Sequence, residues 1–139
     1  MEETVELVPI HVEKVLQSRS YTCIVLDGEE KKFAIYCDVP SGKAMNLYLS
    51  STEKPRPGTH DLMNRIFMGL NIKLKHVVVY DVEETIYYAR IFFEQQIGEI
   101  LHIVEIDSRP SDGITLALMH KVPIYSTRRV LDKTIPYED

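Results

Sequence analysis

The chain has 139 residues, of which 45% are hydrophobic and 27% are charged, a balance typical of one soluble globular domain. Sixteen Lys and Arg against 21 Asp and Glu give a net charge of −5, which excludes binding of nucleic acid through bulk positive charge but not through a local basic site. The longest apolar run is far shorter than the ~20 residues of a membrane helix, and no apolar signal segment follows the acidic start. We therefore expect a single cytoplasmic domain over residues 1–139 that does not enter a membrane.

Strand-forming sequence dominates the first forty residues. Residues 5–13 are rich in apolar side chains, and Pro9 indicates an edge strand or a bulge because proline cannot donate a ladder hydrogen bond. Residues 21–26 and 32–36 flank Asp27-Gly28-Glu29-Glu30, which is turn sequence. We therefore expect an extended strand followed by a β-hairpin.

Two helices are predicted in the middle of the chain. The first opens at Pro40 and ends near Ser50, and two further prolines then disfavour helix over residues 52–58. The second begins at Thr59, and its apolar side chains recur at the spacing of one buried helix face. That face consists of Leu62, Met63, Ile66, Phe67 and Leu70.

Three strands follow at about residues 73–80, 85–93 and 99–106, and the short polar turns between them predict antiparallel neighbours. A third helix is expected from Pro110 to His120, and then a short strand and a short last helix. This order of elements predicts an α+β fold with a mostly antiparallel sheet and about three main helices.

The second of these three strands carries four aromatic side chains: Tyr87, Tyr88, Phe92 and Phe93. Because side chains alternate across a strand, half of them should face the core. The other half could form a dimer face or a platform on which bases stack. Since the strand has more large apolar side chains than one face of a small sheet easily buries, we expect a homodimer.

Two polar segments differ from ordinary connections. They read Pro-Arg-Pro-Gly-Thr-His-Asp over residues 55–61 and Asp-Ser-Arg-Pro-Ser-Asp-Gly over residues 107–113. Each places an arginine at the start of a predicted helix and an aspartate inside its first turn. Free N–H groups at the two helix starts, together with Arg56 and Arg109, would form a compact site for an anion such as phosphate.

The other polar residues suit phosphodiester hydrolysis, provided that the two segments meet in space. His60 can transfer a proton near neutral pH. Asp61, Asp107 and Asp112 offer the hard oxygen ligands that Mg²⁺ and Mn²⁺ prefer, whereas the two cysteines lack the spacing of a zinc site. A phosphate clamp, a proton carrier and carboxylates are together what such hydrolysis requires.

The same residues also have a structural interpretation. Thr59 is a good helix N-cap, and Asp61 would suit the positive end of the helix dipole. Ser108 or Asp107 could cap the third helix, and each arginine could pair with an aspartate of the other segment. Under this interpretation the residues brace the fold, or they form a non-catalytic module that binds an anionic ligand or a partner.

The two segments resemble the bifunctional nuclease family. The matching stretches are residues 55–62 and 106–114, and the order of strands and helices fits over about residues 5–135. The Asp-Ser-Arg-Pro-Ser-Asp string is specific to this resemblance. The resemblance implies an α+β domain, usually self-associated, that acts on both DNA and RNA.

Under this resemblance we expect a nuclease with little sequence preference. Arg56 and Arg109 would hold the scissile phosphate, and His60 would act as general acid or base. The three carboxylates would bind Mg²⁺ or Mn²⁺ or orient water. The matching hydroxyl residues that could bind substrate are Thr59, Ser108 and Ser111.

One position departs from the family pattern. Family members often carry a glutamate in the segment that leads into the first helix, and Ser41 stands at the corresponding position here. If that glutamate binds a metal, this chain lacks a ligand or uses Asp38 instead. The departure and the net charge of −5 favour the binding module, whereas the family resemblance favours the nuclease.

Overall fold

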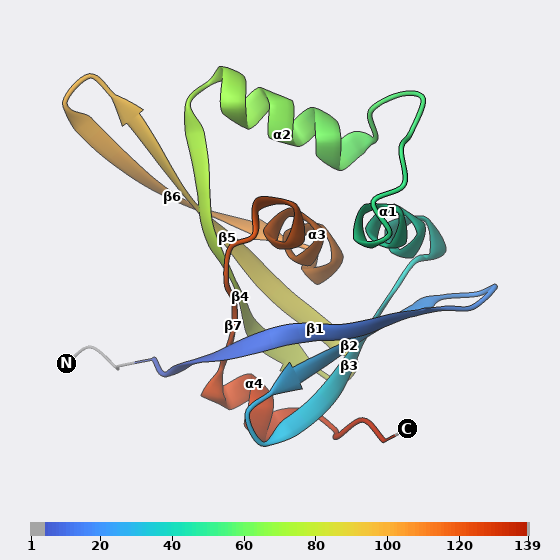
Figure 1. Ribbon diagram of the computed structural model, residues 1–139. Coiled ribbons are helices and arrows are strands. Elements are labelled where there is room, and N and C mark those ends of the chain that lie inside the picture. Colours follow the sequence, from blue (N-terminus) through green and yellow to red (C-terminus); the bar gives the residue numbers. More distant parts are fainter. Residues whose placement is uncertain (1–4, 139) are drawn as a thin grey trace.

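The computed structural model describes residues 5–138, and Figure 1 shows the path of the chain. The strands are β1 (Leu7–Gln17), β2 (Thr22–Gly28), β3 (Lys31–Cys37), β4 (Ile72–Glu83), β5 (Ile86–Ile97), β6 (Ile100–Ser108) and β7 (Ile124–Thr127). The helices are α1 (Val39–Leu49), α2 (Thr59–Gly69), α3 (Pro110–His120) and α4 (Arg128–Lys133).

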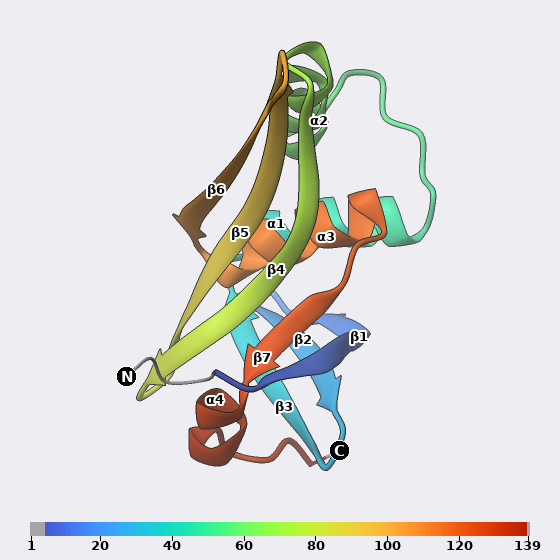
Figure 2. The ribbon, with the colours of Figure 1, turned by 90° about the vertical axis from the view of Figure 1, so that its left-hand side faces the viewer.

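All the strands of the described chain belong to one sheet, in the order β3-β2-β1-β7-β4-β5-β6. Neighbours pair antiparallel, except β4 and β7, which are parallel. Helices α1, α2 and α3 pack together on one side of the twisted sheet, and α4 packs against β4 and β7 (Figures 1 and 2). The predicted α+β fold with three main helices is confirmed. None of the helices in residues 5–138 is long and apolar enough to cross a membrane.

The hairpin of β4 and β5 is longer than the sequence predicts, because residues 81–83 and 94–97 belong to strands and not to turns. The turns that remain are Glu84-Thr85 and Gly98-Glu99. Glu84 and Gly98 have φ values of 57° and 60°, and a positive φ is what tight two-residue hairpin turns require. Residues 81–83 and 94–97 carry polar side chains, so their sequence is similar to that of a loop.

Strand β1 lies inside the sheet and not at an edge. Pro9 pairs with Tyr125 of β7, and the ladder to β2 begins only at Ile10. The missing N–H of Pro9 is tolerated because no residue of β2 is paired with it. The bulge in β1 lies further along, between Val12 and Lys14.

The aromatic strand β5 is also an interior strand, and its large apolar side chains are covered within the chain except Ile86 and Ile97 at its two ends. Phe93 is buried, and Tyr87 stacks on Phe33. Phe92 stacks on His76 with 4.4 Å between the ring centroids. The excess of apolar side chains on this strand, from which we expected a homodimer, is therefore not an exposed surface.

Helix α2 buries only part of its predicted apolar face. Met63 and Phe67 pack against the core, and the Phe67 ring centroid lies 4.9 Å from that of Phe93 on β5. α2 lies at the periphery of the molecule (Figure 2), where no described element covers its outer side. The rest of the predicted face is therefore an outer stripe that is 48–56% exposed: Leu62, Ile66 and Leu70.

Helix α3 packs against β4 and β5. Its side chains Ile114, Leu116 and Ala117 are buried. At Gly113 the helix approaches the sheet so closely that an added Cβ would lie 3.0 Å from Val77 Cγ1. This close approach fixes the height of α3 above the sheet, and with it the position of its first turn.

The packing of α1 on the first hairpin can be tested at Gly42. Gly42 is buried, and an added Cβ would overlap Thr22 Oγ1 and Gln17 Oε1. We expect Gly42→Ala to lower the free energy of unfolding by about 3 kcal/mol in urea denaturation. In the matched control Gly69→Ala, the space around the added Cβ is open to 4 Å, so we expect a gain of at most ~1 kcal/mol. Equal effects at the two glycines would contradict this packing.

His120, in the last turn of α3, should make stability depend on pH. Burial lowers the pKa of His120, and within the described residues its Nε2 has no hydrogen-bond partner. The fold therefore keeps the ring neutral, the unfolded chain binds more protons, and stability falls as the pH falls through the ordinary histidine value of 6.5.

We expect His120→Leu to reduce the loss of stability between about pH 7.5 and about pH 5.5, measured by chemical denaturation. Burial also lowers the pKa of His76, so part of the pH dependence should remain. The control is His11→Leu at an exposed position of β1, which should leave the dependence unchanged. An unaltered dependence in His120→Leu would disprove this assignment.

Candidate functional site

The first turns of α1, α2 and α3 meet, and a chain of polar contacts connects them. Asp38 caps α1 by accepting a 2.7 Å hydrogen bond from the backbone N–H of Ser41. Arg109, the N-cap residue of α3, donates from Nη1 to Asp38 Oδ2 at 3.0 Å. Asp112, in the first turn of α3, then connects Arg109 to His60 of α2. We call these four side chains, Asp38, Arg109, Asp112 and His60, the polar cluster.

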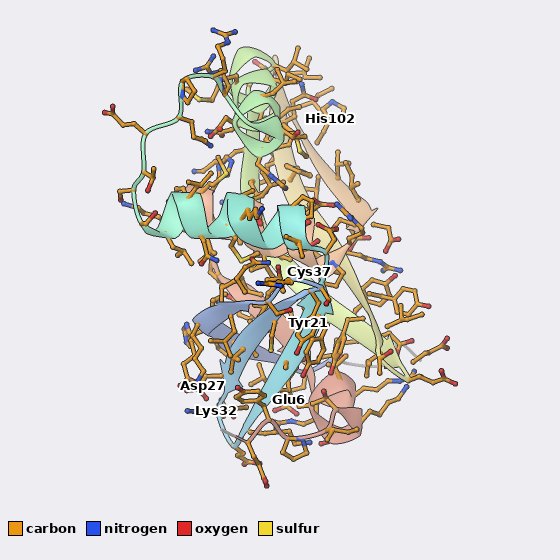
Figure 3. The ribbon with its side chains drawn as sticks, turned by 90° about the vertical axis from the view of Figure 1, so that its right-hand side faces the viewer. Glu6, Tyr21, Asp27, Lys32, Cys37 and His102 are labelled. Atoms are coloured by element: carbon orange, nitrogen blue, oxygen red, sulfur yellow. The ribbon has the colours of Figure 1, made fainter. Side chains whose placement is uncertain are left out.

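Arg109 is held by two carboxylates although its side chain is 63% exposed. Its Nε and Nη2 donate to the two oxygens of Asp112 at 2.9 and 3.2 Å, which is a bidentate geometry. Asp112, and after it Asp38, raises the pKa of Arg109. Hydrogen bonds from Ser41, and to a lesser extent Arg109, lower the pKa of Asp38. Asp38 directly follows Cys37, which ends β3 beside α1 and is labelled in Figure 3.

His60 approaches Asp112 with its Nε2, which lies 3.1 Å from Asp112 Oδ1, and its side chain is 14% exposed. A carboxylate at one ring nitrogen fixes the orientation of a histidine and leaves the other nitrogen to exchange a proton with a substrate. The structure thus brings together His60 from the first polar segment with Arg109 and Asp112 from the second. The sequence offered Asp38 only as a substitute metal ligand.

Asp61 serves the start of its own helix. Its Oδ2 accepts the backbone N–H of Gly58 at 2.7 Å and pairs with Lys54. Lys54 is the largest cause that lowers the pKa of Asp61. Gly58 is the N-cap residue, so the exposed Thr59 is the first residue of α2 and not its cap. None of the described contacts of Asp61 is to Asp112.

Asp107 lies on the face of the sheet opposite α3. It pairs with Arg90 across the β5–β6 ladder, and directly paired residues share a face. Ile91, the next residue of β5, lies beside Gly113 of α3, so Arg90 and Asp107 face the other way. On that face Asp107 accepts a 2.8 Å hydrogen bond from the Tyr80 hydroxyl. Strand geometry therefore separates Asp107 from the polar cluster.

The serines of the second segment support the start of α3. The Ser108 hydroxyl donates to the carbonyl of Arg109 at 3.1 Å. Ser111 is only 3% exposed, and its carbonyl accepts the Thr115 hydroxyl at 2.7 Å. Arg109 occupies the N-cap position, so neither Asp107 nor Ser108 caps this helix.

Arg56 lines a hollow of about 590 Å³ between the loop that precedes α2 and one side of that helix. Lys54 and Arg65 line the same hollow, and Asp61 forms part of its wall. We call this feature the basic hollow. Arg109 instead lines a smaller hollow of about 250 Å³ at the start of α3. The sequence interpretation missed Lys54 and Arg65, although the i, i+4 spacing of Asp61 and Arg65 indicates a shared side of the helix.

The three carboxylates that the sequence offers as metal ligands have separate partners. Asp61 caps α2, Asp107 faces away from α3, and Asp112 belongs to the polar cluster. Within residues 5–138, no three His, Cys, Asp or Glu side chains are placed to hold a metal ion together. Asp38 and Asp112, which share one arginine, are a pair of carboxylates at the site.

Comparison with known proteins relates the chain to one domain family. A sequence model of the bifunctional nuclease domain matches residues 24–137. Uncharacterized protein Rv1829 of Mycobacterium tuberculosis (strain H37Rv) is 32% identical over 102 residues, which are 73% of this chain and 58% of that protein. Bifunctional nuclease 1 of Oryza sativa subsp. japonica is 28% identical over 76 residues, which are 55% of this chain and 23% of that protein. The bifunctional nuclease of Oryza minuta matches to the same extent.

The chain thus spans somewhat more than half the length of the mycobacterial relative and less than a quarter of the rice protein. The domain match, in contrast, covers most of the chain. It includes both polar segments, all three long helices and every member of the polar cluster. The chain therefore belongs to the bifunctional nuclease domain family.

Proposed function

We propose that the chain is a nuclease that hydrolyses phosphodiester bonds of DNA and RNA with little sequence preference. The observation that carries this proposal is the 3.1 Å contact between His60 and Asp112, with Arg109 bound to the same carboxylate. A positioned proton carrier beside an arginine is what cleavage of a phosphodiester needs. Membership of a family named for nuclease activity supports the same conclusion.

His60 is the proposed general acid or base. Because its Nε2 is bound by Asp112, its Nδ1 is the atom that would take a proton from an attacking hydroxyl or give one to a leaving oxygen. Asp112 would hold the ring in place and stabilise its charged form. Both effects need the bidentate contact of Arg109, which fixes the orientation of the Asp112 carboxylate.

Arg109 and the basic hollow are the proposed phosphate-binding groups. The described contacts of Arg109 use three of the five N–H donors of a guanidinium, so two can reach a phosphate oxygen. Arg56, with Lys54 and Arg65, would hold the neighbouring phosphates of the strand. The exposed Thr59 hydroxyl, next to His60, is a further proposed contact.

A divalent cation, Mg²⁺ or Mn²⁺, is the proposed cofactor. Mg²⁺ is commonly bound by one or two carboxylates together with substrate phosphates, so a site of three protein ligands is not required. Asp112 and Asp38 are the carboxylates that would hold it. When bound, the cation would neutralise negative charge on the phosphate.

The second candidate function is a non-catalytic module that binds an anionic ligand or partner through the polar cluster. Two observations favour it: Arg109 is already engaged by two carboxylates, and Ser41 stands where the family often has glutamate. Such a module needs no proton carrier, so the two candidates differ in the role of His60.

We also propose that the chain functions as a homodimer, as the family resemblance implies. Strand β5 does not supply the contact, because it lies inside the sheet. The nuclease proposal is independent of the dimer, since His60, Arg109 and Asp112 meet within one chain.

Substitutions at His60 and Arg109 separate catalysis from folding. We expect His60→Ala to slow cleavage of single-stranded DNA and RNA about 10²–10⁴-fold, which is the usual contribution of a positioned proton carrier. We expect Arg109→Ala to weaken substrate binding at a cost of only ~1 kcal/mol of stability, because its ion pairs are exposed. Cleavage assays and thermal melts of the same preparations measure both effects.

The matched control for these variants is Asp107→Asn. Because Asp107 faces away from α3, this change should leave the cleavage rate within about twofold of wild type. Wild-type protein that cleaves neither nucleic acid, or a folded His60→Ala variant with full activity, would disprove the nuclease. A large drop in melting temperature for Arg109→Ala would instead favour the interpretation of the cluster as a brace.

Removal of metal tests the cofactor. We expect EDTA to abolish cleavage, and added Mg²⁺ or Mn²⁺ to restore it. Asp112→Asn should raise the metal concentration needed for half-maximal cleavage, whereas Asp61→Asn should not, because Asp61 is bound to its own helix start. Cleavage that continues unchanged in EDTA would exclude an essential metal and leave the His60–Asp112 pair as the catalytic unit.

A further inference from the structure

The smaller hollow beside Arg109 has an aromatic wall. It encloses about 250 Å³ where the end of β3, the start of β5 and the first turn of α3 meet. Arg109 and Asp38 of the polar cluster form part of its lining. The two strands add large apolar side chains: Tyr36, Ile86 and Tyr87. We call this feature the aromatic hollow, and it joins a charged group to an apolar wall.

Tyr36 presents an exposed ring to the aromatic hollow. Its exposed fraction is 57%, and among residues 5–138 the only other exposed aromatic side chain is Tyr21, at 47%. The two rings meet edge to face, with 5.4 Å between their centroids. This contact supports Tyr36 from one side and leaves the rest of the ring open. Ile86, which is 61% exposed, adds to the same apolar surface, and exposed apolar side chains gathered at one hollow are typical of a binding site.

Tyr87 is a fixed part of the aromatic hollow. Its ring stacks on Phe33 with 5.8 Å between the centroids, and its hydroxyl shares a hydrogen bond with the hydroxyl of Thr134. Burial raises the pKa of Tyr87, so the hydroxyl keeps its proton at neutral pH. A wall that is already held in place loses little conformational freedom when a ligand binds.

A second hollow extends the aromatic hollow away from Arg109. It encloses about 360 Å³ and shares Tyr36, Thr85 and Tyr87 with the first. Its lining includes Tyr137 of the C-terminal segment. A ligand longer than one ring therefore has a continuous path along β3, from the polar cluster past Tyr36 to the C-terminal segment.

We propose that the aromatic hollow binds one unpaired base of a nucleic acid strand, stacked on Tyr36, while Arg109 holds the phosphate of the same nucleotide. The described contacts of Arg109 leave two of its N–H donors for that phosphate. Stacking tolerates every base because each has a π face, which agrees with a nuclease of little sequence preference. The inference rests on the proposed function, from which it takes the ligand, and it adds the requirement for an unpaired strand.

The size and the charge of the aromatic hollow favour this occupant. Pockets for drug-sized ligands enclose about 300–1,000 Å³, so a hollow of about 250 Å³ suits a single planar ring. A base inside a duplex is paired and stacked between its neighbours, and it would have to leave the helix to reach Tyr36. An apolar peptide could cover the rings, but it would bring no anion to Arg109, whereas a nucleotide supplies a ring and a phosphate together.

The experiment removes the ring and the base separately. Binding of a labelled oligothymidylate of about 12 nucleotides is measured by fluorescence anisotropy in EDTA. We expect Tyr36→Ala to weaken this binding about 5- to 150-fold, the usual effect of losing one stacked base. For a strand of the same length whose nucleotides carry no base, we expect a change of at most about twofold, because nothing is left to stack.

Two variants control for the fold and for apolar surface. Tyr36→Phe keeps the ring and should bind the oligothymidylate within about twofold of wild type. Ile103→Ala removes a 70% exposed side chain of β6 that lines neither hollow, and it should bind as wild type does. Equal weakening of both strands by Tyr36→Ala would overturn the proposal, because the loss would not come from stacking. A folded Tyr36→Ala variant with wild-type affinity would also overturn it and would favour a peptide as the occupant.

The requirement for an unpaired base is tested with a duplex of oligothymidylate and oligoadenylate. Tyr36→Ala should change binding of this duplex at most about twofold, since its paired bases do not reach the ring. A loss as large as that for the single strand would overturn the requirement.

The binding test is separate from the test of the nuclease. Base-dependent binding by a protein that cleaves nothing would support the aromatic hollow and disprove the nuclease. Cleavage by wild-type protein, with oligothymidylate binding that does not depend on Tyr36, would overturn the aromatic hollow alone. Wild-type protein that fails to bind oligothymidylate at about 100 μM would also overturn it.

Discussion

The Arg109 guanidinium bonds to carboxylates from the first turns of α1 and α3, and through Asp112 it determines how His60 of α2 is held. Without a cation between them, Asp38 and Asp112 would be two like charges facing each other. Because the pairs are exposed, they add little to global stability. Their effect is geometric: the bidentate contact allows the Asp112 carboxylate one orientation, and that orientation presents one oxygen to the histidine. The mutual orientation of the polar side chains at the three helix starts therefore depends on one arginine.

The position of Arg109 is fixed in turn by the packing of α3. Gly113 brings the first turn of this helix against Val77, and Ser111 in the same turn is buried. Strand β6 delivers the chain to this turn, and the alternation of its side chains sends Asp107 to the far face of the sheet. Of the two aspartates in the second segment, backbone geometry thus selects Asp112 for the site.

Much of this could be predicted from the sequence, because strand and helix periodicity and turn residues are local signals. The elements, the fold class and the two polar segments could be identified in this way. The face on which Asp107 lies could not, since it depends on the register of β6 with β5 and on which face α3 covers. The sequence allowed two roles for Asp61, as a metal ligand or as a group that stabilises the start of α2. The hydrogen bond from the Gly58 N–H to Asp61 supports the second role. Asp38 was missed as the partner of Arg109 because 71 residues separate the two in the chain.

Helix α2 illustrates why the spacing of apolar residues alone could not show which side of the helix is buried. Met63 and Phe67 face the core, Arg65 lines the basic hollow, and Ile66 belongs to the exposed outer stripe. Apolar side chains of α2 occupy both its buried side and its outer stripe. The sequence pattern does not separate these two sides, so it indicates one broad buried face. The side chains of the outer stripe add to the apolar pattern of the helix without belonging to the core. In this structure the start of α2 presents His60 to the polar cluster and its end is attached to β5, so the position of the histidine depends on contacts at both ends of one helix.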